Sequence, residues 1–290
     1  MKRFSKNKWP LAFTGINIIL FITFFLVPAI LGFYYSLTDY KGYSGENFIG
    51  FANYIELFKD ESFYKALLRT VEYTVCQVPL VYAVSLSVAL LLNSEKAKGK
   101  FISKIIFFLP WTISGIVAGV IWRWLFGENF GFINYVISRL NGTEVPWFTN
   151  GTFAFIVIIF ASVWGATAFN MLQFMTALKN IPKSLYEAAD IDGARWIDKF
   201  LHITLPTLKP TSFMVILLGT IGAMKEFALV QSLTNGGPGT ENMLIVQYIY
   251  TTGFDKMRVG YASSASMVLF AILLCLGLVQ MKMGGRSNEE

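Results

Sequence analysis

Side chains capable of covalent chemistry are few in this sequence and lie far apart. Its single histidine, His202, has no cysteine nearby, and Cys76 and Cys275 fall in separate apolar runs. Cysteines so placed act as small hydrophobic side chains rather than as a disulfide or a metal pair. A phosphate-binding loop requires G-x-x-x-x-G-K-[S/T], whereas the Gly-Lys-Phe run at 99–101 lacks the upstream glycine and the hydroxyl. We therefore expect a chain that is not an enzyme, with no catalytic residue, no metal site and no cofactor of its own.

Ionisable side chains are densest in the segment KSLYEAADIDGARWIDKFLHITLP, Lys183–Pro206. The pattern predicts two short amphipathic helices: one opened by a Ser184/Glu187 capping box, and one over 194–204 that is ended by the prolines at 206 and 210. Gly193 supplies the turn between them. Such a pair could lie on lipid headgroups, but its many acidic residues suit anionic lipid poorly. An exposed acidic and apolar surface is better matched to a groove in a partner protein.

Lys225 and Glu226 interrupt the apolar stretch IGAMKEFALVQSLTNGGP. Ionisable groups inside a membrane are costly, which makes them candidates for function. Neighbours on a helix point about 100° apart, so these two side chains cannot pair with each other. They either line a functional path, or they lie near the outer water layer or pair with other helices.

The stretches that hold these residues are long and apolar. The chain is 54% hydrophobic and only 14% charged, more apolar than a soluble domain of 290 residues could bury. Six stretches reach the roughly 20 residues that a membrane-spanning helix needs. They are 11–35, 71–92, 104–126, 153–178, 211–233 and 261–281. The first is too long for a signal peptide and is expected to be retained. We predict an all-α membrane protein with six transmembrane helices in a single domain, residues 1–290.

Basic residues predict how these helices are oriented. Most of the 24 lysines and arginines fall in the segments 2–8, 96–104, 179–209 and 282–286. Basic residues accumulate in cytoplasmic connections, so both termini and the Lys183–Pro206 segment are expected in the cytoplasm. The net charge of +6 is scattered among apolar stretches, with no recognisable nucleic-acid-binding module. Nucleic acid is therefore not an expected partner, whereas a lipid bilayer is.

The charged segment resembles the EAA loop of permease subunits of binding-protein-dependent ABC importers, whose signature is E-A-A-x-x-x-G followed about nine residues later by I-x-L-P. The matching residues are Glu187, Ala188, Ala189, Gly193, Ile203, Leu205 and Pro206. The resemblance implies a coupling helix that sits in a cleft of a cytoplasmic ATPase subunit and moves when the ATPase dimer closes. The implied contact residues are Glu187, Ala188, Ala189, Asp192, Gly193, Trp196 and Phe200.

Three further stretches, Phe48–Thr70, Leu233–Asn242 and Phe254–Phe270, are similar to the sugar-importing branch of these permeases. The similarity is strongest to the maltose, lactose and glycerol-phosphate type, in which two different permeases pair. It implies a second homologous permease subunit, a dimer of cytoplasmic ABC ATPase that uses ATP and Mg, and an extracytoplasmic solute-binding protein. The implied location is the cytoplasmic (inner) membrane of a bacterium or archaeon, as a multi-pass protein.

The same resemblance implies a substrate path, because polar positions just before the T-N-G-G-P turn contact sugar in this branch. Carried onto this chain, the path residues are Ser162, Ala166, Phe169, Asn170, Gly219, Ala223 and Glu226. Several of them are small where the branch has polar side chains, which predicts a shallow pocket with more contacts from the partner permease. Phe169 could stack on a sugar ring, and Glu226 could accept hydrogen bonds from hydroxyls.

The predicted function is that of a permease subunit that imports carbohydrate, in particular an oligosaccharide, driven by a separate ATPase through the EAA loop. One alternative is an importer of glycerol-phosphate-like or other small polar solutes, which Lys225 would favour and Glu226 would oppose. A second alternative is a membrane scaffold or channel without ATP coupling. Co-purification of a nucleotide-binding subunit would separate that alternative from an importer.

Overall fold

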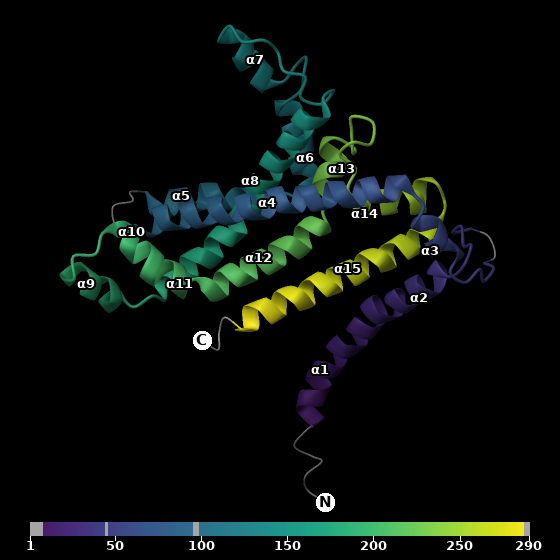
Figure 1. The fold of residues 1–290 in the computed structure, drawn as a ribbon, viewed down its shortest axis with the longest axis horizontal. Helices are drawn as coiled ribbons and strands as arrows, with labels where there is room; N and C mark the ends of the chain where they lie inside the picture. The colour runs from purple at the N-terminus through teal and green to yellow at the C-terminus, as the bar shows by residue number, and fades with distance from the viewer. Residues whose placement is uncertain (1–7, 44–45, 95–98, 287–290) are drawn as a thin grey trace, which may run out of the picture. The chain divides into compact units, whose positions relative to one another are not determined.

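The computed structural model describes residues 8–43, 46–94 and 99–286, and it is helical almost throughout (Figure 1). Within these ranges β-structure is limited to one isolated bridge between Thr38 and Phe48. The prediction of an all-α protein is therefore confirmed. The chain divides into two compact units, one holding residues up to Phe63 together with Tyr248–Ile272, the other holding Tyr64–Gln247 and the residues from Leu273 on.

The first unit begins with one long apolar helical run. It consists of α1 (Lys8–Phe21), a π-helical turn at Ile22–Leu26 and α2 (Val27–Ser36). The unit also contains α3 (Ala52–Leu57), the second half of α14 (Ile245–Tyr250), a π-helical turn at Thr251–Asp255 and the first part of α15 (Val259–Arg286).

A polar cluster ties α3, α14 and α15 together within this unit. Asp60 Oδ2 accepts hydrogen bonds from the hydroxyls of Tyr248 (2.5 Å) and Tyr261 (2.9 Å), and Arg258 pairs with Glu56 at 2.7 Å. Burial raises the pKa of Asp60, but the hydrogen bonds that the carboxylate accepts outweigh it and hold that pKa below its ordinary value. The carboxylate therefore stays charged and keeps these three elements joined.

The second unit contains the longest helices of the chain. These are α4 (Glu61–Asn93), which begins in the first unit, and α8 (Gly151–Lys179). The shorter helices are α5 (Lys100–Phe108), a 3₁₀ turn at Leu109–Thr112, α6 (Gly115–Leu125), α7 (Phe132–Arg139), α12 (Lys209–Met224) and α13 (Ala228–Leu233). Between α8 and α12 lie α9 (Lys183–Ile191), α10 (Trp196–Lys199), a π-helical turn at Phe200–Thr204 and α11 (Leu205–Thr207).

Four helices are long and apolar enough to cross a membrane, and two bent pairs could raise the number to six. The four are Thr14–Ser36, Glu61–Asn93, Gly151–Lys179 and Val259–Gly284. The bent pairs are Lys100–Thr112 with Gly115–Leu125, at 103°, and Trp196–Thr207 with Lys209–Met224, at 65°.

Two of the predicted spans differ from straight helices. The stretch 104–126 bends because Ser114 takes an extended conformation and its hydroxyl caps α6 by accepting from the Val117 N–H at 3.3 Å. The stretch 211–233 is divided, since α12 ends at Met224 and α13 begins only after Phe227. Backbone breaks of this kind are tolerated at membrane depth where they line a cavity or lie inside protein.

The segment between α6 and α8 is folded around Glu128. Glu128 Oε1 accepts from the backbone N–H groups of Phe148 and Thr149, both at 2.7 Å. Burial raises the pKa of this carboxyl, but these bonds outweigh it and leave the pKa below its ordinary value. Asn150 Oδ1 then caps α8 by accepting from the N–H groups of Thr152 and Phe153.

Helices α6 and α13 pack closely because Gly119 has no side chain. A Cβ placed at Gly119 would overlap Ser232 Oγ and lie 2.9 Å from the Leu229 carbonyl oxygen. Small residues at such crossings allow backbones in membrane proteins to approach each other.

We expect Gly119→Val to push α13 away from α6 and to lower the thermal midpoint of the protein, since overpacking costs about 1–3 kcal/mol. Fluorescence-detected size-exclusion chromatography after heating would measure the change. Gly277→Val in α15 is the matched control, because nothing lies within 4 Å of a Cβ at that glycine. Equal midpoints for the two variants would contradict the close contact.

Two apolar clusters form the core of the second unit. One joins α4, α6, α8 and α13 around residues such as Tyr73, Ile158 and Leu233. The other joins α4, α8 and α12 around Phe174, Leu208 and Val215. The first surrounds the candidate site described next, and the second supports the segment between α8 and α12.

Candidate functional site

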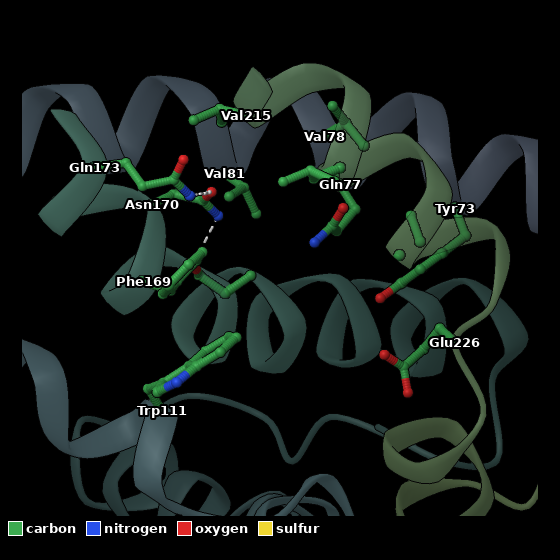
Figure 2. A pocket seen from close by; sticks show the side chains of 15 residues that line it. Tyr73, Gln77, Val78, Val81, Trp111, Phe169, Asn170, Gln173, Val215 and Glu226 are labelled. Atoms are coloured by element: carbon green, nitrogen blue, oxygen red, sulfur yellow. Dashed lines mark hydrogen bonds between the residues drawn. The ribbon is translucent and has the colours of Figure 1, made fainter. Parts of the chain in front are cut away.

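Two adjoining cavities lie among α4, α8, the turn after α5 and the end of α12. Their volumes are about 320 Å³ and about 280 Å³, and Figure 2 shows the larger one. They share the lining residues Tyr73, Gln77, Trp111, Ala166 and Glu226, so they lie side by side around one set of side chains. All of these residues belong to the second compact unit.

One wall of the larger cavity is aromatic. The rings of Trp111 and Phe169 stack at 4.8 Å between centroids and 17° between planes (Figure 2). Trp111 belongs to the 3₁₀ turn just before the 103° bend, which is why a residue from that span reaches the cavity. Flat aromatic faces of this kind can pack against the C–H face of a ring-shaped ligand.

Glu226 is the ionisable side chain that lines both cavities. Its Oε1 accepts hydrogen bonds from the backbone N–H groups of Phe227 (3.0 Å) and Leu229 (3.1 Å), so the side chain caps α13. The residue is half-buried and lines both cavities. Lys225 is exposed and lines neither of them, and no described lysine, arginine or histidine does.

Amides and hydroxyls complete the polar lining. Asn170 Nδ2 donates to the Ala166 carbonyl at 2.9 Å, and Gln173 Nε2 donates to Asn170 Oδ1 at 3.4 Å. From α4, Tyr73 and Gln77 reach the same space one helical turn apart (Figure 2). The cavity is therefore mostly apolar with a few convergent polar groups, as small-molecule sites usually are.

The structure brings all seven predicted path residues to this space. Ser162 lines the smaller cavity, Ala166 and Glu226 line both, and the others line the larger one, namely Phe169, Asn170, Gly219 and Ala223. Their contact with a substrate stays a prediction. Sequence reasoning did not select Tyr73, Gln77, Trp111 or Gln173. A tryptophan directly after a proline inside a span was the signal that could have indicated Trp111.

The part of the chain that the structure describes contains no cluster of metal-ligating side chains. In residues 8–43, 46–94 and 99–286, no three His, Cys, Asp or Glu side chains gather as a metal site would require.

A second candidate surface is the helical segment between α8 and α12. Gly193 has a φ of +73° and makes the predicted turn after α9. The predicted capping box at Ser184 is wrong, because α9 begins one residue earlier at Lys183 and has no side-chain cap. A capping contact is found at the next helix, α10, where Asp198 Oδ2 accepts from the Arg195 N–H at 3.0 Å.

The predicted helix over 194–204 runs further, through Pro206 to Thr207, and ends before Pro210. Pro206 lies inside this helical run, directly after the π-helical turn, whereas Pro210 lies in the first turn of α12, where the missing N–H has no intrahelical partner to lose. The helical path therefore runs from α10 into α12 with a bend of 65°.

Two polar contacts join α9 to the rest of the segment, and apolar side chains pack the segment on the helices behind it. Lys199 pairs with Asp190 at 2.6 Å, and the hydroxyls of Tyr186 and Thr204 lie 2.8 Å apart. Tyr186, Phe200 and Ile203 pack on the core cluster formed by α4, α8 and α12. These residues anchor α9 and the π-helical turn on that cluster.

The outer face of the segment is apolar and acidic. Ile191 is 88% exposed and Trp196 67% exposed, and Glu187 is exposed without a hydrogen bond to any described residue. Of the residues implied to contact an ATPase, the exposed ones are Glu187, Ala188, Asp192, Gly193 and Trp196, and the half-buried ones are Ala189 and Phe200. The ring of Phe200 stacks on the ring of Trp196 with 5.5 Å between centroids, and Phe200 also packs on the core cluster.

Comparisons with known proteins give the same picture over nearly the whole chain. Residues 82–281 match the family model described as "Binding-protein-dependent transport system inner membrane component". The chain is 37% identical to the arabinooligosaccharides transport system permease protein AraP of Bacillus subtilis, over 99% of this chain and 92% of that protein. It is 33% identical to the sulfoquinovosyl glycerol transport system permease protein SmoG of Agrobacterium fabrum, over 94% and 88% of the two chains.

Among solved structures, a chain of a bacterial ABC transporter involved in the import of the acidic polysaccharide alginate shares the fold. The TM-score is 0.88, the sequence identity is 23%, and 98% of each chain is covered.

Proposed function

The chain belongs to the binding-protein-dependent transport system inner membrane components, the permease subunits of ABC importers, and from this premise we propose that it imports an uncharged oligosaccharide. Members of this family are transport components rather than enzymes, and the chain is a multi-pass membrane protein. The observation that carries the proposal is the cavity, in which an aromatic wall faces a few hydroxyl, amide and carboxylate groups.

The lining of the cavity supports a neutral cargo over an anionic one. Glu226 is the charged residue in the lining of both cavities, whereas Lys225 lies outside that lining. A carboxylate at low dielectric repels phosphate, sulfonate or uronate groups, and no described cation offsets that repulsion. The glycerol-phosphate-like alternative therefore has less support than an oligosaccharide.

The chemistry of a sugar fits the two sides of the cavity. We propose that a sugar ring lays its C–H face on the Trp111–Phe169 pair and directs hydroxyls toward Glu226, Asn170 and Gln173. The oligosaccharides named for AraP and the neutral disaccharides named for other relatives, such as trehalose and maltose, suit this chemistry. The second permease subunit would contribute the remaining contacts.

The energy would come from a separate ATPase dimer that binds ATP and Mg and grips the surface between α8 and α12. The exposed Glu187, the turn at Gly193 and the apolar Trp196 suit a cleft in such a subunit. On this proposal the segment is cytoplasmic, as the basic residues indicate. An extracytoplasmic binding protein would deliver the sugar from the other side of the inner membrane.

Reconstitution of the tagged chain with its partner permease, ATPase and binding protein in proteoliposomes tests the proposal. We expect the ATPase to co-purify with the tagged chain and to drive accumulation of at least one neutral sugar among arabinotriose, maltotriose, trehalose and diacetylchitobiose. Glycerol 3-phosphate and an oligouronate should not accumulate. Uptake without ATP would point to a channel, and preferred uptake of an anion would contradict the cargo class.

A further inference from the structure

Gln77 is a buried amide without a bonding partner. The residue is 7% exposed, its Oε1 is buried without a hydrogen-bond partner, and its Nε2 donates to no described residue. Unpaired buried amides are costly, and native structures pair the large majority of them. An apolar residue of similar size would fit this position in a membrane helix without that cost, so the amide calls for a reason.

Other buried polar side chains of α4 satisfy their own hydrogen-bonding groups. Thr70 and Thr74 donate to the carbonyls one turn earlier, at 2.7 Å and 2.8 Å. Ser85 donates to the Thr167 carbonyl on α8 at 3.4 Å. The helix α4 is described in full, and Gln77 stands apart from these residues on it.

Other amides with an unpaired oxygen still donate through their nitrogen. Asn242 donates to Gly151, Gln247 donates to Gln231, and Gln280 donates to Thr220. None of these three amides lines either cavity. Gln77 lines both of them, and its amide points into the space where the Tyr73 hydroxyl and the Glu226 carboxylate also converge (Figure 2).

We propose that Gln77 is a specificity-determining residue that hydrogen-bonds a hydroxyl of the transported sugar. An amide both accepts and donates, so it can bind a hydroxyl through its oxygen while its nitrogen donates to the next oxygen on the ring. With Glu226, which only accepts, the pair selects a sugar that presents neighbouring hydroxyls at this wall. The inference rests on the proposed function and adds α4 as a further wall of the sugar site.

The test is direct binding to the complete permease–ATPase complex in nanodiscs, without the binding protein. The probe is the tritiated member of the neutral panel that the complex transports best, beginning with arabinotriose. Gln77→Leu is expected to raise its Kd about five- to tenfold, the loss of one or two net hydrogen bonds. Gln280→Leu is the matched control, because it also replaces an amide whose oxygen is buried and unpaired, and it should leave Kd unchanged.

Monodeoxy forms of the same sugar identify the bonded hydroxyl. For one deoxy form, wild type should lose affinity while Gln77→Leu loses nothing further, which is the non-additivity expected of a direct contact. If water alone satisfies Gln77, then Gln77→Leu will bind like wild type, every deoxy form will lose affinity equally in both proteins, and the inference is overturned. A wild-type complex that accumulates no neutral sugar would instead contradict the proposed function.

Discussion

Glu187→Ala and Gly193→Pro should each abolish ATP-driven uptake while leaving the membrane helices folded. Truncating one side of a charge contact at a protein interface costs about 2–5 kcal/mol, a fall of roughly thirtyfold or more in affinity for the ATPase. Gly193 has a φ of +73°, and proline is confined to a φ near −65°, so the turn after α9 cannot form in the second variant. Uptake and retention of the ATPase on the tagged permease are the measurements.

Two variants in the same segment serve as controls. Ser184→Ala changes an exposed residue of α9 that makes no capping contact, and it should couple normally. Gly193→Asn keeps a residue that tolerates positive φ and should retain most of the activity. Wild-type uptake by both Glu187→Ala and Gly193→Pro would remove the ATPase contact from this surface.

The second large effect is expected at Trp111. Trp111→Ala removes one ring of the stacked pair, and losing the burial and stacking of an aromatic side chain costs about 2 kcal/mol, roughly thirtyfold in Kd for the sugar. Trp111→Phe should recover much of this affinity. Binding to the nanodisc complex gives both values.

Trp124→Ala is the control for this variant, because Trp124 is 66% exposed on α6 and lines neither cavity. It should leave the sugar affinity unchanged. If both tryptophan variants weakened binding equally, the effect would come from the membrane anchoring of the helices and not from a sugar contact.

Much of the helical architecture could be predicted from hydropathy alone, because long apolar runs in this chain have no other way to satisfy their backbone groups. The bend at Ser114 and the break at Lys225–Phe227 could not, since hydropathy assigns each stretch to one span despite the charged pair in the second. Whether a polar residue in such a run caps a new helix depends on the neighbouring helices, and those are set by tertiary packing.

In the candidate site, too, some residues could be predicted from the sequence and others depend on tertiary packing. Phe169 and Glu226 carry a readable signal, an aromatic and a carboxylate on the spans that flank the charged segment. Trp111 and Gln77 reach the cavity only because the span at Ser114 is bent and because α4 packs against α8. The Ser184 capping box failed for a local reason, since Pro182 lets α9 begin at Lys183 and places Ser184 inside the first turn.

The two roles of Glu226 limit how the substrate specificity of this protein can change. The same carboxylate that faces the cavity also holds the start of α13, so a change there disturbs the scaffold together with the selectivity. Gln77, Asn170 and Gln173 cap no helix. A lineage under selection for a different nutrient should therefore accumulate its substitutions at those three amides first, while the glutamate at position 226 is retained.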